Sequence, residues 1–422
     1  MSGKIVNNVF RASGVIAATP GGLDWSTAVV TGSTLTATAG KGYFINTTSN
    51  ACTVTLPSSA EIGDQIVFAD YARTWSTNNL IIDSNGNNFQ GDPDTYTVDY
   101  STAGQSLNIV YSDATKGWLP VSDDAVADVG VAPARAIFAF GDDRSNRVSM
   151  SNIVSDSGVV ASDTSGVGEV RVNPAGAKYG GDKAIFAFGT GASADINTRA
   201  LVSNLGVISA DASGAGTARP NLKATGYGDD LAIFAYGHKG GVVSMSNLVN
   251  NSGVVGSDVS GVGTARRELG AGRYGSSGQA MFAFGVSSAN VSIKNLVTNV
   301  GVIGSDVTGV GTVRSQLAAC SFAGDRLIFG YGNADAGLSN LSNKVSNSGV
   351  VASDTSGVGT ARSVLAAAGY GGDKGIFGFG DDASGVLSLT NLVNTSGVIS
   401  ADVTGVGTAR YGLAGAEIGG ST

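Results

Sequence analysis

The hydrophobic residues of this chain fall in short runs that glycine, asparagine, aspartate and serine separate. One stretch contains four such runs in succession, at residues 365–370, 375–379, 386–392 and 397–400. Short apolar runs with turn residues at both ends are the signal of β-strands. Glycine is frequent and no 3.6-residue period persists, so the pattern does not favour helices. The chain is therefore predicted to be all-β.

The four runs recur with a fixed period. Each copy ends in Gly-Val-Gly-Thr-Ala-Arg or a close variant, and the final arginine returns every 47 or 48 residues, as Arg171, Arg219, Arg266, Arg314, Arg362 and Arg410. A second marker, Ile-Phe-Ala-Phe-Gly or similar, keeps the same spacing and begins at Ile137, Ile185, Ile233, Met281, Ile328 and Ile376. Four short strands at this period are typical of a β-propeller blade. The six copies predict a six-bladed propeller.

The order of strands within a copy predicts how the propeller closes. The run that resembles residues 365–370 is poor in bulky side chains, which suits an innermost strand, and the aromatic run after it is expected in the core. The first copy begins directly at its aromatic run and has no small-residue strand before it. Residues 411–418 supply a matching run, in which Ile418 takes the place that Tyr370 holds in the sixth copy. We expect this C-terminal strand to complete the first blade, leaving no unpaired strand edge.

The first 125 residues lack the repeat. Short runs at residues 51–56, 65–69, 79–82, 96–98 and 107–111 predict a small all-β domain. A polar stretch that ends at Pro133 follows and has the composition of a linker. We therefore divide the chain into an N-terminal arm at 1–20, a β domain at 21–122, a linker at 123–134 and a propeller at 135–422.

Composition narrows the classes of function. The 422 residues are 42% hydrophobic and 14% charged with a net charge of −8, which is enough apolar material for a core and too little charge for disorder. No cluster of Lys and Arg indicates nucleic-acid binding. Cys52 and Cys320 lie far apart and are expected to be free thiols. The start of the chain lacks a signal peptide, and no run of about 18 apolar residues predicts membrane insertion, so we expect folding in a cytoplasm.

The motifs that suggest chemistry are better explained by structure. His238 is the only histidine, so a histidine-based metal site or catalytic triad finds no partners. The Asp-Thr-Ser-Gly sequence resembles an aspartic-protease motif, but that chemistry needs one close pair of carboxylates and this motif recurs in every copy. We predict that these residues form Asx or ST turns, which hydrogen-bond their own backbone. The repeat arginines are expected to bind turn carbonyls or a carboxylate of the adjoining blade, and a cationic ring on one face is the alternative. No catalytic residue, cofactor or metal ligand is assigned.

The loops after the Phe-Gly runs differ in every copy, whereas the turns from Asp to Arg barely differ. Loops on one face of a scaffold often carry binding residues, and drift of exposed turns is the alternative. Two of the loops are acidic enough to suggest a hard cation such as calcium, although two carboxylates each are few. The candidate contact residues are Asp142, Asp143, Arg144, Asn146, Arg147, Asp195, His238, Lys239, Asn290, Asn333, Asp335, Asp381 and Asp382.

Two resemblances follow from these motifs. The order of an arginine, a small-residue strand, Tyr-Gly-Gly as in Tyr179-Gly-Gly181, and an aromatic strand resembles the kelch repeat. It departs from kelch in ending that strand with Phe-Gly and in lacking the later tryptophan. The sequences of the copies include Ser-Asn-Leu-Val, Ser-Gly-Val-Val and Gly-Val-Gly-Thr-Ala-Arg. They resemble repeats in tail-fibre and appendage proteins of tailed bacteriophages, notably aquatic and marine ones, more closely than they resemble kelch repeats. Phrases of the first domain, such as residues 42–46 and 111–118, resemble the β domain that precedes the distal part of such fibres.

The phage resemblance implies a non-enzymatic virion structural protein, assembled in the host cytoplasm and exposed on the particle. In that family the β domain is usually trimeric and the N-terminus attaches to other virion proteins. The candidate anchor residues are Ile5, Val6, Val9 and Phe10. The propeller is expected to contact a host-surface receptor, a glycan above all. Two alternatives remain: a purely architectural decoration or connector protein, and a glycan depolymerase, which needs two carboxylates facing one pocket.

Overall fold

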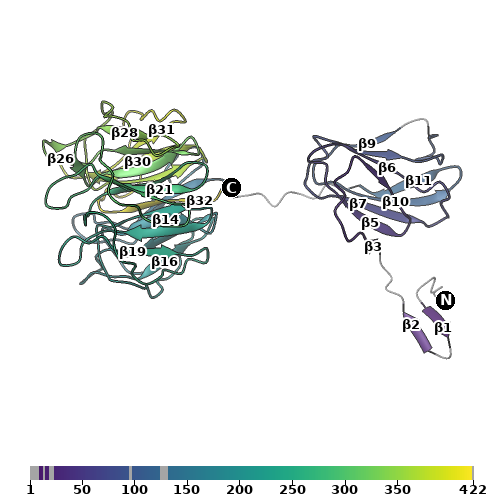
Figure 1. Cartoon of the computed structure of the whole chain (residues 1–422), viewed down its shortest axis with the longest axis horizontal. Helices are drawn as coiled ribbons and strands as arrows, with labels where there is room; N and C mark the ends of the chain where they lie inside the picture. Colours follow the sequence, from purple (N-terminus) through teal and green to yellow (C-terminus); the bar gives the residue numbers. More distant parts are fainter. Residues whose placement is uncertain (1–8, 13–14, 19–22, 95–96, 124–131, 421–422) are drawn as a thin grey trace. The chain divides into compact units, whose positions relative to one another are not determined.

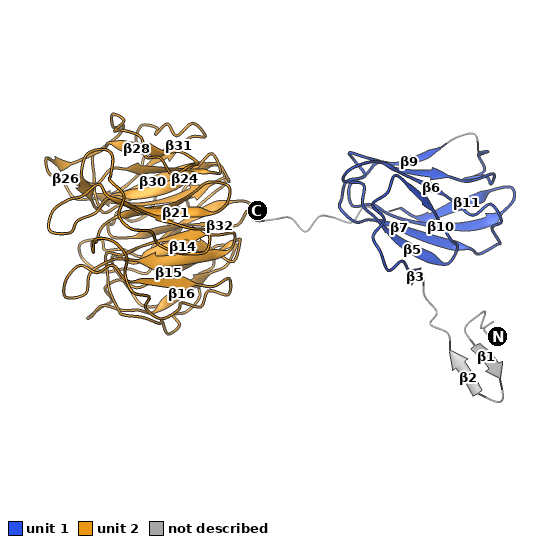
Figure 2. Ribbon diagram, in the orientation of Figure 1, with its two compact units in different colours: residues 1–130 blue, residues 131–422 orange. Residues whose placement is uncertain are grey.

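The computed structural model of the chain describes residues 9–12, 15–18, 23–94, 97–123 and 132–420 (Figure 1). It divides into two compact units, Met1–Gly130 and Val131–Thr422 (Figure 2). Every regular element in the described ranges is a β-strand, which confirms the all-β prediction. No helix in the described part of the chain is long and apolar enough to cross a membrane.

The first unit begins with a hairpin of two strands. β1 (Val9–Ala12) pairs antiparallel with β2 (Val15–Ala18). Of the candidate anchor residues, Val9 and Phe10 belong to β1, whereas Ile5 and Val6 lie outside the described residues. The other strands of the unit are β3 (Asp24–Trp25), β4 (Thr34–Thr36), β5 (Lys41–Ile45), β6 (Cys52–Thr55), β7 (Gln65–Asp70), β8 (Leu80–Asp83), β9 (Val98–Tyr100), β10 (Ser106–Asp113) and β11 (Gly117–Ser122).

These strands form two sheets, and the chain alternates between them from β3 to β8. One sheet has the order β11-β10-β7-β5-β3 and the other β4-β6-β8-β9, with parallel pairing among β3, β5 and β7 and among β4, β6 and β8. Residues on β6 and β10 alternate between buried and partly exposed, as expected for strands with one face toward a core. The core includes Trp75 and Trp118, both fully buried.

The sequence pattern located most of this unit. The runs at residues 51–56, 65–69, 79–82 and 107–111 are strands, and the run at 96–98 is displaced to Val98–Tyr100. The pattern missed β1 to β5 and β11. β11 contains Pro120 and pairs with β10 through two register shifts, so its apolar alternation is interrupted.

The second unit contains seven three-stranded sheets, counted over the residues that the structure describes, and six of them correspond to the sequence repeats. We number them as repeats 1 to 6 and call their strands first, second and third. In that order the strands are β32 (Ala414–Ile418), β12 (Arg135–Ala139) and β13 (Ser151–Val154); β14 (Ala175–Tyr179), β15 (Lys183–Ala187) and β16 (Arg199–Val202); β17 (Lys223–Tyr227), β18 (Leu231–Ala235) and β19 (Ser246–Val249); β20 (Gly270–Tyr274), β21 (Gln279–Ala283) and β22 (Lys294–Val297); β24 (Ala318–Phe322), β25 (Arg326–Gly330) and β28 (Ser342–Val345); β29 (Ala366–Tyr370), β30 (Lys374–Asp381) and β31 (Val386–Val393). A small extra sheet joins β23 (Arg314–Ser315), β26 (Asn333–Ala334) and β27 (Gly337–Leu338).

The expected fourth strand of each copy is not a continuous strand. In repeat 6 the segment contacts the third strand through two isolated bridges, Val393 with Ile399 and Thr390 with Val403. Comparable bridges occur in the other repeats. The prediction of four strands per copy was therefore wrong in this detail, because a glycine-containing turn and a polar segment leave room for only separate bridges.

The C-terminal strand completes the first sheet, as the sequence predicted. β32 pairs antiparallel with β12, with Ile418 opposite Arg135 and Ala414 opposite Ala139. The first strands lie beside one another in the order β14, β17, β20, β24 and β29, and β32 lies beside both β29 and β14. The N-terminal and C-terminal segments of this unit are thus joined within one sheet.

Aromatic side chains connect each sheet to the next. An aromatic residue packs on an aromatic residue inside the next second strand, with ring centroids 5.2 to 5.6 Å apart. It follows its own second strand in repeats 1 to 5, and in repeat 6 it is Phe379 inside β30. The pair Phe379 and Phe138 joins repeat 6 to repeat 1 in the same way. All of these rings are buried, and large buried apolar side chains each contribute about 1.5–3 kcal/mol to folding. The prediction that these aromatics form the core is confirmed.

Candidate functional site

The two ends of the strands in the second unit differ in what they carry. β12 follows the described linker residues 132–134 and is followed by the variable loop that begins at Asp142. We call the end of the sheets near residues 132–134 the linker end, and the opposite end the loop end. Because first and second strands are antiparallel, each first strand begins at the loop end and finishes at the linker end. All six variable loops follow second strands, so they share the loop end.

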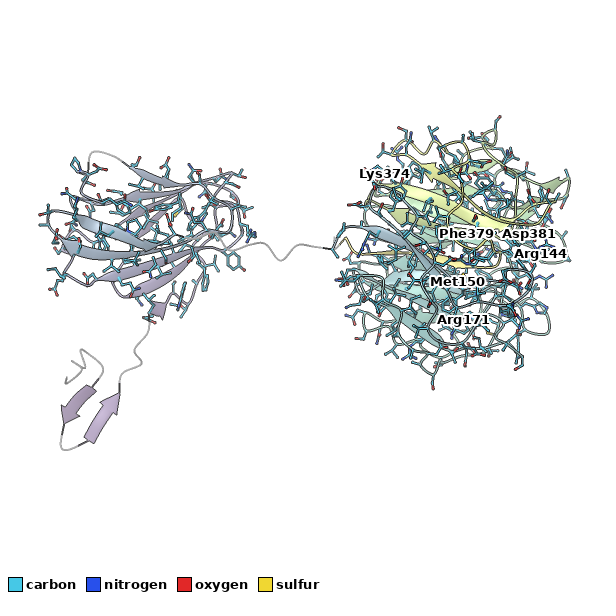
Figure 3. All side chains as sticks on the ribbon, turned by 180° about the vertical axis from the view of Figure 1, so that it is seen from behind. Arg144, Met150, Arg171, Lys374, Phe379 and Asp381 are labelled. Atoms are coloured by element: carbon cyan, nitrogen blue, oxygen red, sulfur yellow. The ribbon has the colours of Figure 1, made fainter. Side chains whose placement is uncertain are left out.

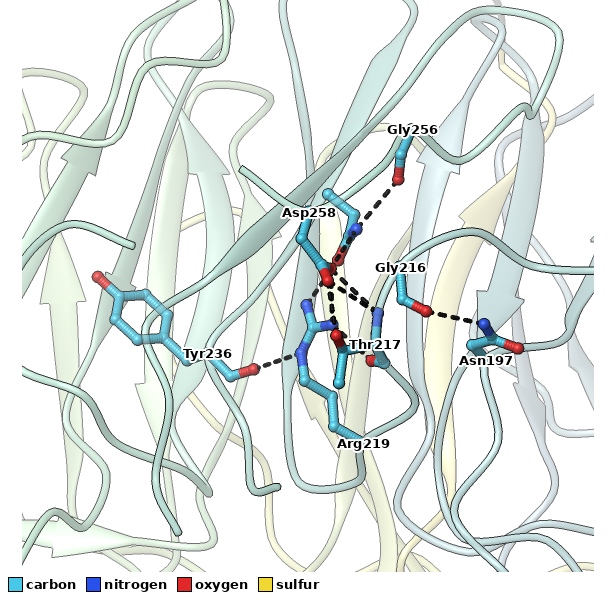
Figure 4. Close-up of polar contacts among 8 residues, drawn as sticks. Asn197, Gly216, Thr217, Arg219, Tyr236, Gly256 and Asp258 are labelled. Atoms are coloured by element: carbon cyan, nitrogen blue, oxygen red, sulfur yellow. Dashed lines mark hydrogen bonds and ion pairs between the residues drawn. The ribbon is translucent and has the colours of Figure 1, made fainter. Parts of the chain in front are cut away.

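Each repeat arginine is buried between two neighbouring sheets. Figure 4 shows this arrangement for Arg219. Arg219 donates from Nε to the Tyr236 carbonyl at 2.8 Å, from Nη1 to the Thr217 carbonyl at 3.0 Å and from Nη2 to Asn247 Oδ1 at 2.7 Å. Its guanidinium also lies over the Phe188 ring, 4.7 Å from the centroid. The other repeat arginines are likewise fully buried over an aromatic ring. The expected binding of turn carbonyls is confirmed, and no cationic ring is exposed by these six residues.

The repeat aspartates do not form the predicted Asx turns. Asp258 instead accepts hydrogen bonds from the backbone N–H and hydroxyl of Thr217 in the preceding repeat and from Asn247 Nδ2. Its carboxylate lies 3.8 Å from the Arg219 guanidinium. A buried guanidinium needs acceptors on several sides and a nearby negative charge. The aspartate supplies that charge when it faces the arginine cluster. Asp163, Asp306, Asp354 and Asp402 make equivalent contacts.

Electrostatics within this cluster stabilise the ionised aspartate. Burial opposes ionisation of Asp258, but the hydrogen bonds from Thr217 and Asn247 and the charge of Arg219 outweigh it, so the pKa of Asp258 lies below its ordinary value. Burial lowers the pKa of Arg219 to about 10, with Asp258 opposing the change. Both groups are therefore charged at neutral pH.

Repeat 2 departs from the common pattern in a way that shows how the cluster works. Ala200 stands where the other repeats carry an asparagine, as Asn152, Asn247, Asn295, Asn343 and Asn391. There Arg171 Nη2 bonds Asp211 directly at 2.5 Å. Removing the amide has brought the two charges together, so the asparagine acts as a bridge between arginine and aspartate in the other repeats.

The aromatic-Gly pair at the end of each second strand adopts an uncommon backbone. Phe140 has φ 65° and Gly141 has φ 114°, and the five equivalent aromatic residues have φ between 62° and 65°. A bulky residue rarely adopts this region without compensation. The compensation is visible here, since the Phe140 carbonyl accepts from Arg410 Nε at 2.8 Å and the Gly141 N–H donates to the Arg171 carbonyl.

A closed ring of backbone hydrogen bonds lies at the loop end, just before the first strands. Six residues, one from each repeat, donate their N–H to the carbonyl of the preceding member at 2.7 to 3.3 Å, and the cycle returns to its start. All six have φ between 53° and 63°. The members are Asn173, Asn221, Glu268, Gln316, Val364 and Gly412. We call this the backbone ring.

Several candidate contact residues join neighbouring variable loops. Arg144 of repeat 1 binds Asp381 of repeat 6 at 2.6 Å, and Figure 3 labels this pair. Arg147 donates to the Gly191 and Ala192 carbonyls of repeat 2. Asn290 Nδ2 donates to Asp335 Oδ1 at 2.8 Å, joining repeats 4 and 5.

Other candidate residues act within their own loops. Asp143 accepts from the backbone N–H groups of Ser145 and Asn146, and Asp142 accepts from that of Arg144. Asp382 caps its own turn in the same way, Asp195 accepts from the Thr190 hydroxyl, and Asn333 belongs to β26. His238 is half-buried and Lys239 is exposed. No group of three or more metal-ligating side chains is found in the described ranges, and the acidic turns are instead capped or paired.

A cavity of about 410 Å³ runs between the first strands of all six repeats. Its wall is mostly alanine and glycine, and its charged lining residues are Lys178, Lys223, Asp229, Arg273 and Glu417. Gly420 and Ala134 border it at the linker end. A smaller cavity of about 160 Å³ adjoins the backbone ring, and Lys223 lines both. We call the larger one the axial cavity.

Sequence reasoning missed the bridging asparagines and Lys223, although signals for both were present. The asparagine recurs at the repeat period. Lys223 stands four residues before the terminal tyrosine of its first strand, where the other five repeats carry only alanine or glycine. Both signals come from comparing equivalent positions among the copies, and neither comes from a motif.

Comparison with known proteins adds no family to this description. No protein-family model matches the chain, and no curated protein matches it.

Proposed function

We propose that this chain is a structural protein of a tailed-bacteriophage virion, a tail fibre or similar appendage that recognises the host surface. In this proposal the six sheets of the second unit are the blades of a six-bladed kelch-like β-propeller. The cyclic order of first strands, the pairing of β12 with β32 and the backbone ring support that architecture. The N-terminal part attaches to other virion proteins, as a homotrimer.

One observation carries the recognition role. The six variable loops share the end of the sheets opposite to the linker residues 132–134, so the tether and the most varied surface are separated by the length of the strands. The variable loops therefore do not lie at the end of the second unit where the chain joins the linker. The loops also keep exposed polar groups, such as Lys239 and Asp335, that suit hydrogen bonding to a glycan.

The contacts between loops favour a defined binding surface. Arg144 with Asp381 and Asn290 with Asp335 hold loops of neighbouring repeats together. Ordered groups lose less conformational entropy when a ligand binds. Several weak sites on an oligomer would add avidity of about 10²- to 10⁴-fold through multivalency.

Binding of the purified full chain to candidate host cells and to their extracted surface glycans tests the proposal. A variant should carry the loop at residues 142–147 exchanged for the shorter loop of repeat 3, and a matched control should carry Arg326→Ala, an exposed residue at the linker end. Saturable binding that the loop exchange abolishes and Arg326→Ala retains is expected. Absence of binding to any host surface favours the architectural alternative, and release of reducing ends from the glycan favours the depolymerase.

A further inference from the structure

Lys223 is a charged side chain at a position that the other repeats fill with the smallest residues. The equivalent residues are Ala175, Gly270, Ala318, Ala366 and Ala414, all of them buried. Lys223 begins β17 at the loop end, so it lies at the inner part of the axial cavity, away from the border that Gly420 and Ala134 form. The fold of the repeat therefore does not require a cation here.

The ammonium group of Lys223 has no protein partner in the described ranges, since none of the hydrogen bonds or ion pairs found there involves it. The other two cations of the axial cavity differ. Lys178 Nζ binds Glu417 at 2.8 Å and the Gly420 carbonyl at 3.0 Å, and Arg273 lies 3.8 Å from Asp229. Glu268 is the backbone-ring member of the next repeat, and its carboxylate pairs with Arg267 at 3.4 Å.

Lys223 is half-buried. An ammonium group without a protein hydrogen bond inside a cavity keeps fewer water contacts than one on an open surface, and this loss of hydration is costly. Burial lowers the pKa of Lys223 to about 8, and only the charge of Glu268 opposes this. A bound anion would compensate for the lost hydration and raise the pKa again. The cavity volume of about 410 Å³ falls in the range of small-molecule sites, about 300–1,000 Å³.

We propose that the axial cavity is a binding site for a small anion, one whose carboxylate or phosphate group pairs with the Lys223 ammonium. The charged lining carries three cations and two carboxylates, so it has an excess of one positive charge in a chain whose net charge is −8. Alanine and glycine leave the room that the ligand occupies. This site is separate from the variable loops and does not depend on host recognition.

Isothermal titration calorimetry of the full chain tests this site. The probes are glucuronate and inorganic phosphate, with glucose as the uncharged match for glucuronate. We expect saturable binding of one or both anions and none of glucose, and the anion that binds distinguishes a carboxylate ligand from a phosphate ligand. Lys223→Ala should weaken binding about 10- to 100-fold, as for loss of a charged hydrogen-bonding partner.

Lys223→Ala is expected to fold, because four other repeats carry alanine at this position. Lys223→Arg keeps the charge and should retain part of the affinity. Lys183→Ala is the control and should change nothing, because this side chain is 48% exposed at the linker end of repeat 2 and lines neither cavity. Equal affinities of wild type and Lys223→Ala, or no saturable binding of either anion at millimolar concentrations, would overturn the proposal.

The pH dependence gives a second readout that a structural role would not produce. Glucuronate affinity should fall as the pH rises from neutral through and beyond about 8, because the lysine loses its proton. Affinity that stays constant over this range contradicts pairing with Lys223. The other titratable groups around the cavity and the backbone ring, among the described residues, are Lys178, Tyr179, Asp229, Glu268, Arg273, Cys320, Tyr411 and Glu417.

Discussion

Replacing one repeat arginine with methionine tests the idea that the buried arginine clusters hold neighbouring sheets together. Arg266 donates to the Phe284 carbonyl at 2.9 Å, the Thr264 carbonyl at 3.1 Å and Asn295 Oδ1 at 2.7 Å, and it lies 4.2 Å from the centroid of the Tyr236 ring. Methionine fills the volume of the aliphatic stem but leaves these acceptors without a donor.

The expected loss combines several terms. Each buried acceptor left unpaired costs about 1–3 kcal/mol, and the cation–π contact contributes about 0.5–2 kcal/mol. Removing the buried charge offsets part of this loss of stability, because the cost of desolvating the guanidinium disappears. We expect a net loss of about 3 kcal/mol for Arg266→Met, which lowers Tm by about 6 °C in a unit of this size.

Differential scanning calorimetry of the full chain measures this loss, and tryptophan fluorescence assigns the transitions. Trp25, Trp75 and Trp118 all belong to the first unit, so their fluorescence should follow a transition that the substitution leaves unchanged. Arg326→Met is the control, because the Arg326 side chain is 53% exposed and such changes usually cost less than about 0.5 kcal/mol. If Arg266→Met and Arg326→Met shift Tm equally, the clusters do not stabilise the unit as we argue.

Three further predictions concern the same unit and the thiols. Deletion of residues 411–422 removes β32 and one member of the backbone ring. Calorimetry should then lack the unfolding transition of the second unit, whereas the unfolding transition of the first unit, followed by tryptophan fluorescence, should remain. The second unit should lose stability in acid. The pKa values of Asp163, Asp258, Asp306, Asp354 and Asp402 lie below the ordinary 3.8. Their contribution to stability is therefore present above pH 3.8 and disappears as the pH falls through the lowered pKa of the folded state. Unchanged Tm of this unit from neutral pH to below pH 3.8 would contradict that assignment. Cys52 and Cys320 are buried and free, and burial raises the pKa of both thiols, so a thiol reagent should modify them only after unfolding; rapid reaction of the native protein would be inconsistent with their burial.

The sequence predicted what depends on local periodicity. The second strands, the small-residue first strands and the completion of the first sheet by the C-terminal strand all followed from aligning the copies. It did not predict the partners of Asp258, because a carboxylate beside Ser and Gly can cap its own turn or reach the neighbouring repeat, and only the packing of the sheets decides. Lys223 was missed because a lysine among alanines and glycines reads as a surface residue until the first strands surround it.

The placement of β12 also determines how a pulling force would enter the second unit. β12 connects the linker residues 132–134 directly to the variable loop at Asp142, and it is paired on one side with β32 and on the other with β13. Tension between the linker and that loop therefore acts along the strand, parallel to its neighbours and perpendicular to the ladder hydrogen bonds. Several of these bonds must break together before the strand slides, whereas a strand peeled from one end loses them one at a time. The unit is consequently built to resist stretching along the same line that separates its tether from its loops.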